Sequence, residues 1–332
     1  MLNHNYIKKF AIYFLGVLVL IFLSTGCTKV FDQQAIQKVD PIHPKDAKRE
    51  IILSKAQNKV VVYFTTADKM NLVPVTFEVN PTEEMAKVST EKLLGGPSDQ
   101  FLDNAIPDGT KLKDLYKFDN IAYVDLTKEF LSIKNDIEAA QAVNALVFTL
   151  TEFSQVGSVQ ILIDGKVPEK SYGGIDITKA LHRPEKINFY GYNGKNKYKV
   201  YYYDINAMYM VPVTFATDRE VSPEMVVEKL LQNPPKESKL GVSPIWKGTK
   251  LLGVGLMLDT ANVNLSKEAL AYGGGAAAEG GLVNSLTLTL TELPNIKKIQ
   301  LLIEGKKPEY LPEGTDISQP WERPEKINFI QR

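Results

Sequence analysis

The chain has very little cysteine and histidine, and it carries no net charge. Cys27 is the only cysteine among 332 residues, and the only histidines are His4, His43 and His182. The histidines share no metal-ligand spacing and no cysteine assists them, so we expect no zinc site and no cofactor. Lys plus Arg and Asp plus Glu both number 39, which gives no global bias toward nucleic acid.

The sequence also lacks familiar catalytic motifs, including the nucleophile elbow, the phosphate-binding P-loop and the zinc-protease helix. A glycine-rich stretch, 273–281, has no following Lys-Ser/Thr and does not follow a clear strand, so we expect a flexible loop there. Asp125 and Glu129 could form a glycosidase-like carboxylate pair. A second copy of this region, described below, has Asn264 and Glu268 instead, which favours a solvated strand end. We therefore expect no catalytic residue.

The N-terminal segment is typical of an export signal. Lys8 and Lys9 precede a hydrophobic run, Phe10–Leu23, of 14 residues, which is short for a transmembrane helix. The run ends at Leu23-Ser-Thr-Gly-Cys27, which resembles the lipobox of bacterial lipoproteins. That resemblance implies cleavage before Cys27 and diacylglycerol on its thiol. The alternative is that Phe10–Leu23 remains as a membrane anchor. Either way, we expect residues 28–332 to be held at the cell membrane on its extracytoplasmic face.

The rest of the chain is an internal repeat. The stretch Asn144–Glu169 returns as Asn284–Glu309, 140 residues later, with most residues kept or conservatively replaced. Each copy has apolar residues at helical spacing, including Leu150 and Leu290, followed by a short apolar strand. Because Leu150 and Leu290 lie on matching helix faces, we expect both in the core.

The two copies predict tandem α+β domains. Val73-Pro-Val-Thr-Phe77 is repeated as Val211-Pro-Val-Thr-Phe215, and we expect Val60–Tyr63 to correspond to Val200–Tyr203. Each copy reads strand-strand-helix-strand-strand-helix-strand, which favours two helices on one face of a mainly antiparallel sheet. The expected organisation is a signal peptide at 1–26, a polar tether at 27–58, domain 1 at 59–190 and domain 2 at 191–332.

The repeated unit resembles the GerMN domain of sporulation and spore-germination proteins. The similarity lies in Asn284-Ser-Leu-Thr-Leu-Thr-Leu-Thr-Glu-Leu-Pro and Leu302-Ile-Glu-Gly-Lys, and in their counterparts from Asn144 and Leu162. It implies a fold similar to ring-building domains, membership of a sporulation envelope complex, and a scaffold or assembly role without catalysis. Whether the protein forms oligomers or rings stays open. The alternative function is an envelope enzyme or accessory factor that acts on peptidoglycan.

Two further patterns have competing interpretations. The first is a tyrosine cluster that opens domain 2, in which alternate members would pack in the core and the others would be exposed. The exposed members are either ordinary strand aromatics, which we favour, or part of a partner surface. The second is the identity of Arg183–Phe189 with Arg323–Phe329. We expect each of these segments to fold back on its own domain, burying Ile187 with Phe189, for example. The alternative is a pair of exposed docking strips. The tyrosines are Tyr198, Tyr201, Tyr202, Tyr203 and Tyr209.

Overall fold

The computed structural model describes residues 49–55, 57–271 and 273–330, which belong to one compact unit. The export signal and Cys27 lie outside the described residues, so their predicted roles stay predictions. None of the helices in the described part is long and apolar enough to cross a membrane.

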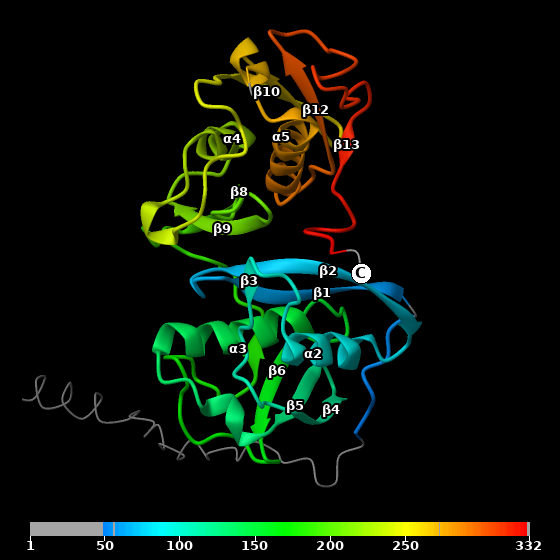
Figure 1. Ribbon diagram of the computed structural model, residues 1–332, viewed down its shortest axis with the longest axis vertical. Coiled ribbons are helices and arrows are strands. Elements are labelled where there is room, and N and C mark those ends of the chain that lie inside the picture. Colours follow the sequence, from blue (N-terminus) through cyan, green and yellow to red (C-terminus); the bar gives the residue numbers. More distant parts are fainter. Residues whose placement is uncertain (1–48, 56, 272, 331–332) are drawn as a thin grey trace, which may run out of the picture. The chain divides into compact units, whose positions relative to one another are not determined.

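Residues 57–182 form repeat 1, whose elements follow the predicted order (Figure 1). A 3₁₀ turn precedes its second helix, and two short strands, β3 and β7, add to the predicted set. The elements are β1 (Gln57–Thr66), β2 (Leu72–Thr82), α2 (Met85–Gly95), β3 (Leu102–Asp103), β4 (Leu112–Phe118), β5 (Ile121–Leu126), α3 (Asp136–Leu150), β6 (Ser158–Ile163) and β7 (Leu181–His182).

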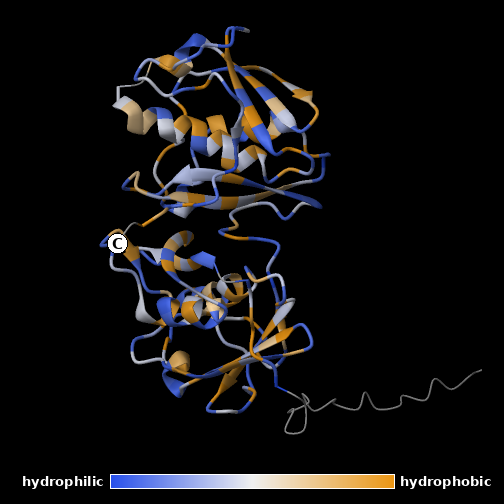
Figure 2. Ribbon diagram, turned by 90° about the vertical axis from the view of Figure 1, so that its right-hand side faces the viewer, coloured by the Kyte–Doolittle hydropathy of each residue, from blue (hydrophilic) through white to orange (hydrophobic). Residues whose placement is uncertain are grey.

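Residues 196–322 form repeat 2, which has the same order without a counterpart of β3 among its described residues. Hydrophobic and hydrophilic residues are mixed over most of the molecule, as Figure 2 shows. The elements are β8 (Asn196–Tyr203), β9 (Met210–Thr217), α4 (Pro223–Leu231), β10 (Leu251–Met257), β11 (Thr260–Leu265), α5 (Gly275–Leu290), β12 (Lys298–Ile303) and β13 (Trp321–Glu322).

Each repeat has three layers, with its two helices between a hairpin and a four-stranded sheet. In repeat 1, α2 and α3 contact β1 on one side and β4 or β6 on the other (Figure 1). In repeat 2, α4 and α5 contact β8 on one side and β10 or β12 on the other. The α+β class is confirmed, although the strands of each repeat are divided between two sheets where we expected one.

The four-stranded sheets contain one parallel pairing each. β5 pairs parallel with β6, and β11 with β12, while their other neighbours are antiparallel. The cause lies in the connection, because α3 or α5 carries the chain across the sheet between the two strands. A helical crossover of this kind returns the chain in the same direction, whereas a short turn reverses it.

The helix ends follow local sequence signals in most places. α4 begins after Ser222, whose side chain accepts a hydrogen bond from the Met225 N–H at 3.2 Å, with Pro223 in the first turn. α2 ends before Gly96, which adopts a φ of 74°. Thr82 is the last residue of β2, and α2 begins at Met85 without a side-chain cap.

The glycine-rich stretch is helical, which corrects the expected flexible loop. α5 begins at Gly275, and Glu279 is fully buried inside its first turns. The Glu279 carboxylate accepts hydrogen bonds from the backbone N–H groups of Glu313 and Thr315, at 2.5 and 3.0 Å. At Gly281, a Cβ atom would lie 2.2 Å from the Tyr203 hydroxyl. Any larger residue here would have to displace the Tyr203 ring, so tertiary packing favours glycine at this helical position despite its low helix propensity.

The opening strands of the two repeats correspond with a different offset from the one we expected. The backbone N–H of Tyr63 donates to the Thr149 hydroxyl, and that of Tyr201 donates to the Thr289 hydroxyl, both at 3.1 Å. Tyr63 is therefore equivalent to Tyr201 (201 − 63 = 138), and the alignment of Val60–Tyr63 with Val200–Tyr203 was wrong by two residues.

None of the five tyrosines of repeat 2 is fully exposed, so the expected alternation fails. The neighbours Tyr201 and Tyr202 are both buried. The Tyr202 hydroxyl donates to the Lys229 carbonyl in α4, whereas the Tyr201 hydroxyl donates to Glu292 just after α5, both at 2.8 Å. Each tyrosine thus has its own partner beside a helix, and the partner-surface interpretation of the cluster loses its support.

Candidate functional site

The identical segments Arg183–Phe189 and Arg323–Phe329, which we call clasp segments 1 and 2, connect the two repeats. Each begins with an arginine held by its own repeat. Arg183 donates to the Phe148 carbonyl at 2.9 Å, to the Tyr63 hydroxyl at 2.8 Å and to the Glu152 carboxylate at 2.6 Å. These bonds fix clasp segment 1 at the end of α3, next to the hairpin of repeat 1.

The arginine of clasp segment 2 makes the equivalent contacts in repeat 2. Arg323 donates to the Leu288 carbonyl at 2.9 Å, to the Tyr201 hydroxyl at 3.0 Å and to the Glu292 carboxylate at 2.7 Å. Lys199 also pairs with Glu292, at 2.8 Å. Bonds of guanidinium to carboxylate are charge-assisted and stronger than neutral ones, so both anchors are well defined.

Further along, each clasp segment bonds to the opposite repeat. Ile187 exchanges hydrogen bonds with Thr214 of β9, in repeat 2, at 2.9 and 3.0 Å. Ile327 exchanges the equivalent bonds with Thr76 of β2, in repeat 1, both at 3.0 Å. The glutamates cross over as well, since Glu185 pairs with Lys197 of repeat 2 at 2.7 Å and Glu325 pairs with Lys59 of repeat 1 at 2.5 Å.

The asparagine of each clasp segment bridges both hairpins. The Asn188 amide donates to the carbonyls of Leu72 in β2 and Pro212 in β9, at 2.7 and 2.8 Å. The Asn328 amide donates to the carbonyls of Pro74 in β2 and Met210 in β9, both at 2.8 Å. Each asparagine also accepts from a backbone N–H, that of Leu72 or Met210 respectively, at 2.7 Å.

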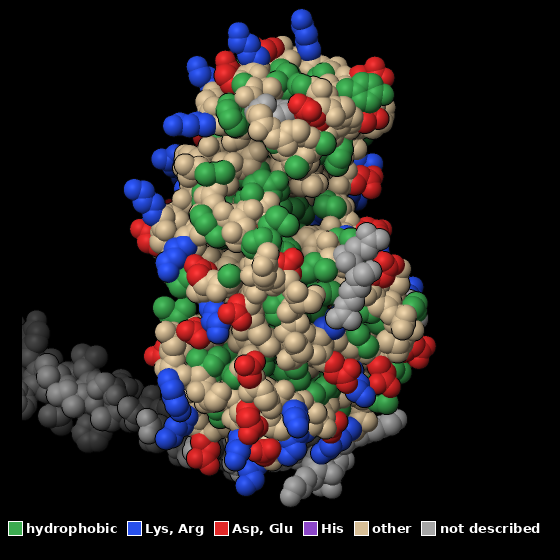
Figure 3. Space-filling view, in the orientation of Figure 1, with side chains coloured by type: hydrophobic (Ala, Val, Ile, Leu, Met, Phe, Trp, Pro, Cys, Tyr) green, Lys and Arg blue, Asp and Glu red, His purple; other side chains and the backbone are tan. Residues whose placement is uncertain are grey.

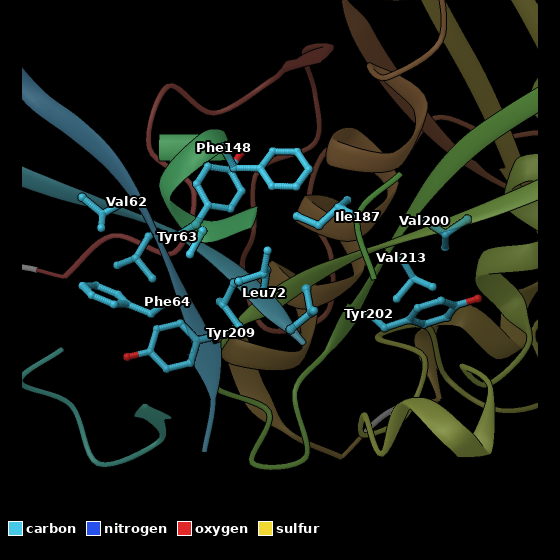
Figure 4. Close-up of a cluster of buried hydrophobic side chains, with 14 of the residues drawn as sticks. Val62, Tyr63, Phe64, Leu72, Phe148, Ile187, Val200, Tyr202, Tyr209 and Val213 are labelled. Carbon is cyan, nitrogen blue, oxygen red and sulfur yellow. The ribbon is translucent and has the colours of Figure 1, made fainter. Parts of the chain in front are cut away.

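These contacts correct the expectation that each segment folds back on its own domain. Only the arginine end does so, while the Ile-Asn end crosses to the other repeat. Ile187 is buried in a hydrophobic cluster that includes residues of both repeats, and Figure 4 shows it near Tyr63 and Phe148. The alternative of two exposed docking strips also fails for Ile187, which is buried. Pro74 lies on β2, the outer strand of its sheet, and its carbonyl accepts one of these bridging bonds.

A cavity of about 300 Å³ lies where the two arginine anchors come together. Burial raises the pKa of Tyr63 and of Tyr201 well above the usual value. Burial alone would raise the pKa of Glu292, but Lys199 and Arg323 outweigh it and hold that pKa below its usual value. The tyrosines therefore stay protonated donors and the glutamate a charged acceptor. Such groups hold a structure together, and none is poised to transfer a proton near neutral pH. The polar lining comprises Tyr63, Glu152, Arg183, Lys199, Tyr201, Glu292, Arg323 and Glu325.

Asp125, which we expected at a solvated strand end, is buried, and the structure gives its carboxylate a structural role. Its side chain accepts a hydrogen bond from the backbone N–H of Gly165 at 2.8 Å. Asn264 accepts the same bond from Gly305, also at 2.8 Å. Since an amide serves as well as a carboxylate, the position needs an acceptor for a turn and no acid or base. Among the described residues there is also no cluster of three or more metal-ligating side chains.

The surface of repeat 2 exposes more large hydrophobic side chains than that of repeat 1. Val242 is 61% exposed and lies with Trp246 on a cavity of about 460 Å³. Hydrophobic side chains are visible on the face of repeat 2 in Figure 3. Among the described residues of repeat 1, 57–182, the only exposed large hydrophobic residue is Ile137, at 55%. The exposed set of repeat 2 comprises Ile205, Met208, Val242, Trp246, Leu252, Leu256, Met257, Leu258 and Tyr310.

Comparison with known proteins assigns both repeats to a family. The family described as "Germane: Sporulation and spore germination" matches residues 61–169 and 199–309, once in each repeat and over more than half of the chain. The chain belongs to this family. The GerMN resemblance seen in the sequence is thus confirmed, and both matches include the helix and strand that carry it.

Individual relatives of the Germane family agree with this assignment. The chain is 29% identical to the spore germination protein GerM of Bacillus subtilis (strain 168) over 275 residues, which are 77% of this chain and 75% of that protein. The solved tandem GerMN domains of the sporulation protein GerM from Bacillus subtilis superpose with a TM-score of 0.64 at 23% identity, covering 82% of this chain and 100% of that one. The tandem fold is therefore shared with that structure.

Proposed function

We propose that this protein is a lipid-anchored, non-catalytic envelope protein that acts in the assembly of a sporulation and germination complex through protein–protein contacts. Membership of the Germane family supports the biological setting. The observation that carries the assembly role is the pair Val242 and Trp246, which are both exposed and line one cavity of repeat 2. Exposed apolar side chains gathered at one place are typical of interaction sites.

The contrast between the repeats allows a matched test of the assembly role. Replacing Val242 and Trp246 with serine should lower spore yield and reduce site-specific cross-linking to envelope proteins in the sporulating host. Ile137→Ser, at a similarly exposed position of repeat 1, is the control and should leave both unchanged. Equal melting temperatures would show that all variants fold. If the Val242/Trp246 variant sporulates and cross-links normally, this surface is not the one used.

The non-catalytic part of the proposal has its own assay. The purified protein should release no soluble fragments from peptidoglycan, at any pH at which it stays folded. Release that disappears on mutation of a carboxylate would establish the alternative, an envelope enzyme.

The lipid anchor is tested at Cys27, the only cysteine of the chain. Cys27→Ala should leave the precursor uncleaved by the lipoprotein signal peptidase and abolish labelling with a radioactive fatty acid. Cys27→Ser serves as a second variant, because it keeps the side chain small and polar but offers no thiol. Normal labelling of either variant would exclude Cys27 as the lipidation site.

A further inference from the structure

Each repeat has a cavity beside its second helix, and the two cavities differ in size. The cavity of repeat 1 has a volume of about 130 Å³, and its lining includes Glu138 of α3. The cavity of repeat 2 has a volume of about 460 Å³, and its lining includes Ala278 of α5, the equivalent residue (278 − 138 = 140). Val242 and Trp246 line this larger cavity. The two repeats thus leave different amounts of space at one shared position.

The loops that line the two cavities correspond with an offset of 139. The backbone N–H of Ile106 donates to the Asn104 side chain at 3.0 Å, and that of Ile245 donates to the Ser243 side chain at 3.2 Å (245 − 106 = 139). Three further lining positions of these loops therefore correspond, namely Asp103 with Val242, Pro107 with Trp246, and Asp108 with Lys247.

In repeat 1, ion pairs occupy the lining of the cavity. Lys69 pairs with Asp103 at 3.7 Å and with Glu138 at 3.9 Å. Lys69 corresponds to Ala207 (207 − 69 = 138), and both have a left-handed backbone, with φ angles of 60° and 56°. None of these three charges is therefore kept in repeat 2, where the residues at the same positions are Ala207, Val242 and Ala278.

The cavity of repeat 2 has a mainly apolar lining that extends from the core to the surface. Ile245, Ala269 and Leu282 line it and are buried in the hydrophobic core, whereas Val242 and Trp246 line it and are exposed. A cavity of this size, with apolar walls and few polar groups, is typical of a binding site. Its walls give the isolated protein an apolar surface in contact with water, and a partner that covers them would gain the free energy of burial.

The charge beside the cavity has the opposite sign in the two repeats. Lys247 is the one charged residue among the described residues that line the larger cavity, and its equivalent in repeat 1 is Asp108. Lys247 is exposed, and no ion pair within the described structure involves it. Lys236 and Lys239 of the same loop are exposed as well. An acidic group on a partner would therefore be attracted to this site.

We propose that the partner inserts a large apolar side chain into this cavity and places an aspartate or glutamate beside Lys247, an inference that rests on the assembly role proposed above. An apolar anchor in a pocket, surrounded by contacts that exclude water, is the usual centre of a protein interface. A protein segment is favoured over a single acyl chain, because a chain inside the cavity would leave Val242 and Trp246 in water, whereas a folded partner covers them.

The test places photoreactive benzoylphenylalanine at position 246 of the full-length protein in the sporulating host, which keeps an aromatic ring there. Irradiation should link this position to a protein. Mass spectrometry should find the link at or next to a large apolar residue that has an aspartate or glutamate nearby in its sequence. The matched control has the same photoreactive residue at position 107, on the smaller cavity of repeat 1, and should give no such product.

Two sets of variants test the charge and the cavity separately. Lys247→Asp gives repeat 2 the charge of repeat 1, and the yield of the cross-link should fall by at least about tenfold, while Lys247→Arg should keep it within about twofold. The triple variant Ala207→Lys, Val242→Asp, Ala278→Glu rebuilds the ion pairs of repeat 1. Those side chains are partly exposed in repeat 1, so the triple variant should keep its melting temperature and lose the cross-link. Lys247→Asp changes only an exposed side chain and decides the matter even where the triple variant does not fold.

Four outcomes would overturn the proposal: no protein linked at position 246, a lipid linked there instead, a linked segment without an acidic residue, or full cross-linking in Lys247→Asp or the folded triple variant. Failure of the assembly role itself looks different, since the serine variant of Val242 and Trp246 would then sporulate normally. If that variant is defective while Lys247→Asp and the triple variant cross-link normally, only the chemistry inferred for the partner is wrong.

Discussion

At the residue scale, Asn188 and Asn328 have an unusual backbone conformation and an unusual set of hydrogen bonds. Their φ angles are 48° and 49°, in the left-handed region that asparagine tolerates better than most residues. In this conformation each side chain reaches one N–H and two C=O groups on β2 and β9. One side chain thus satisfies three backbone groups that no strand pairing covers.

Asn328→Ala should therefore destabilise the protein by about 2–4 kcal/mol, because it leaves partly buried backbone groups of Pro74 and Met210 without a partner. Urea unfolding measures the loss. Asn328→Gly separates the causes, since glycine adopts positive φ without strain and so reports the lost hydrogen bonds alone. Asn188→Ala should behave alike. A loss below about 0.5 kcal/mol would mean that water replaces these bonds without cost.

Leu150 and Leu290 provide the second residue-scale prediction. Both are fully buried, at matching positions of α3 and α5. Leu150→Ala and Leu290→Ala should each lower the free energy of unfolding by about 2–5 kcal/mol, through lost burial and the cavity left behind. Ile137→Ala, on the exposed face of α3, should change it by less than about 0.5 kcal/mol.

At the element scale, each clasp segment is bonded to both repeats and contributes to the stability of both. Each is anchored by its arginine in one repeat and bonded through its isoleucine and asparagine to the hairpin of the other. Stability of either hairpin thus depends on residues that are distant in the chain, since Thr76 and Ile327 are separated by 251 positions.

A chain that ends after Glu322 should therefore have a lower melting temperature than a chain that lacks only residues 331–332. The loss should reach repeat 1, which is untouched in sequence. Hydrogen exchange at the Thr76 amide should accelerate, because its acceptor, the Ile327 carbonyl, is gone. An unchanged rate at Thr76 would refute the crossed arrangement.

Elements governed by local signals were predictable from the sequence. The helix face with Leu150 follows the helical period, and α4 begins at the Ser222-Pro223 signal because capping depends on a few neighbouring residues. The clasp segments were recognisable as important because they recur after the last strand of each repeat. Their destination was not predictable, since the Thr214 and Thr76 groups that receive them lie in the other repeat.

Other details depend on tertiary packing that the sequence alone does not reveal. Three consecutive tyrosines, Tyr201–Tyr203, fit the first strand of repeat 1 in more than one alignment, and the hydrogen bond to Thr289 selects one of them. Likewise, a glycine is favoured at the helical position 281 because Tyr203 fills the space that a Cβ would occupy.

At the scale of the whole molecule, acidic groups tie the repeats together. Lys197 lowers the pKa of Glu185, and Lys59 lowers that of Glu325, both across the repeats. The pKa of Glu292 is also lowered, because Lys199 and Arg323 outweigh its burial. A carboxyl whose pKa is lower in the folded state stabilises the fold above its unfolded pKa and loses this effect as the pH falls through the folded value.

The free energy of unfolding should thus be nearly constant from neutral pH down to about 5, and then fall as the pH drops below the ordinary glutamate value of 4.5. Glu292→Gln should flatten this decline while lowering stability at pH 7. Glu84→Gln, at an exposed pair with Lys87 within one repeat, is a matched control. If the free energy of unfolding falls equally steeply with pH in both variants, Glu292 does not contribute to this pH dependence.

The crossed clasp has a consequence for how such a chain could have arisen. Two separate polypeptides of one repeat each could exchange the same isoleucine and asparagine contacts across a two-fold axis, as a homodimer does. Duplication of the gene within one reading frame would then place both partners on a single polypeptide. The encounter would become intramolecular, with an effective concentration up to the millimolar range for a short linker. On this view the tandem chain is a fused dimer, and its pairing no longer depends on how much protein the cell makes.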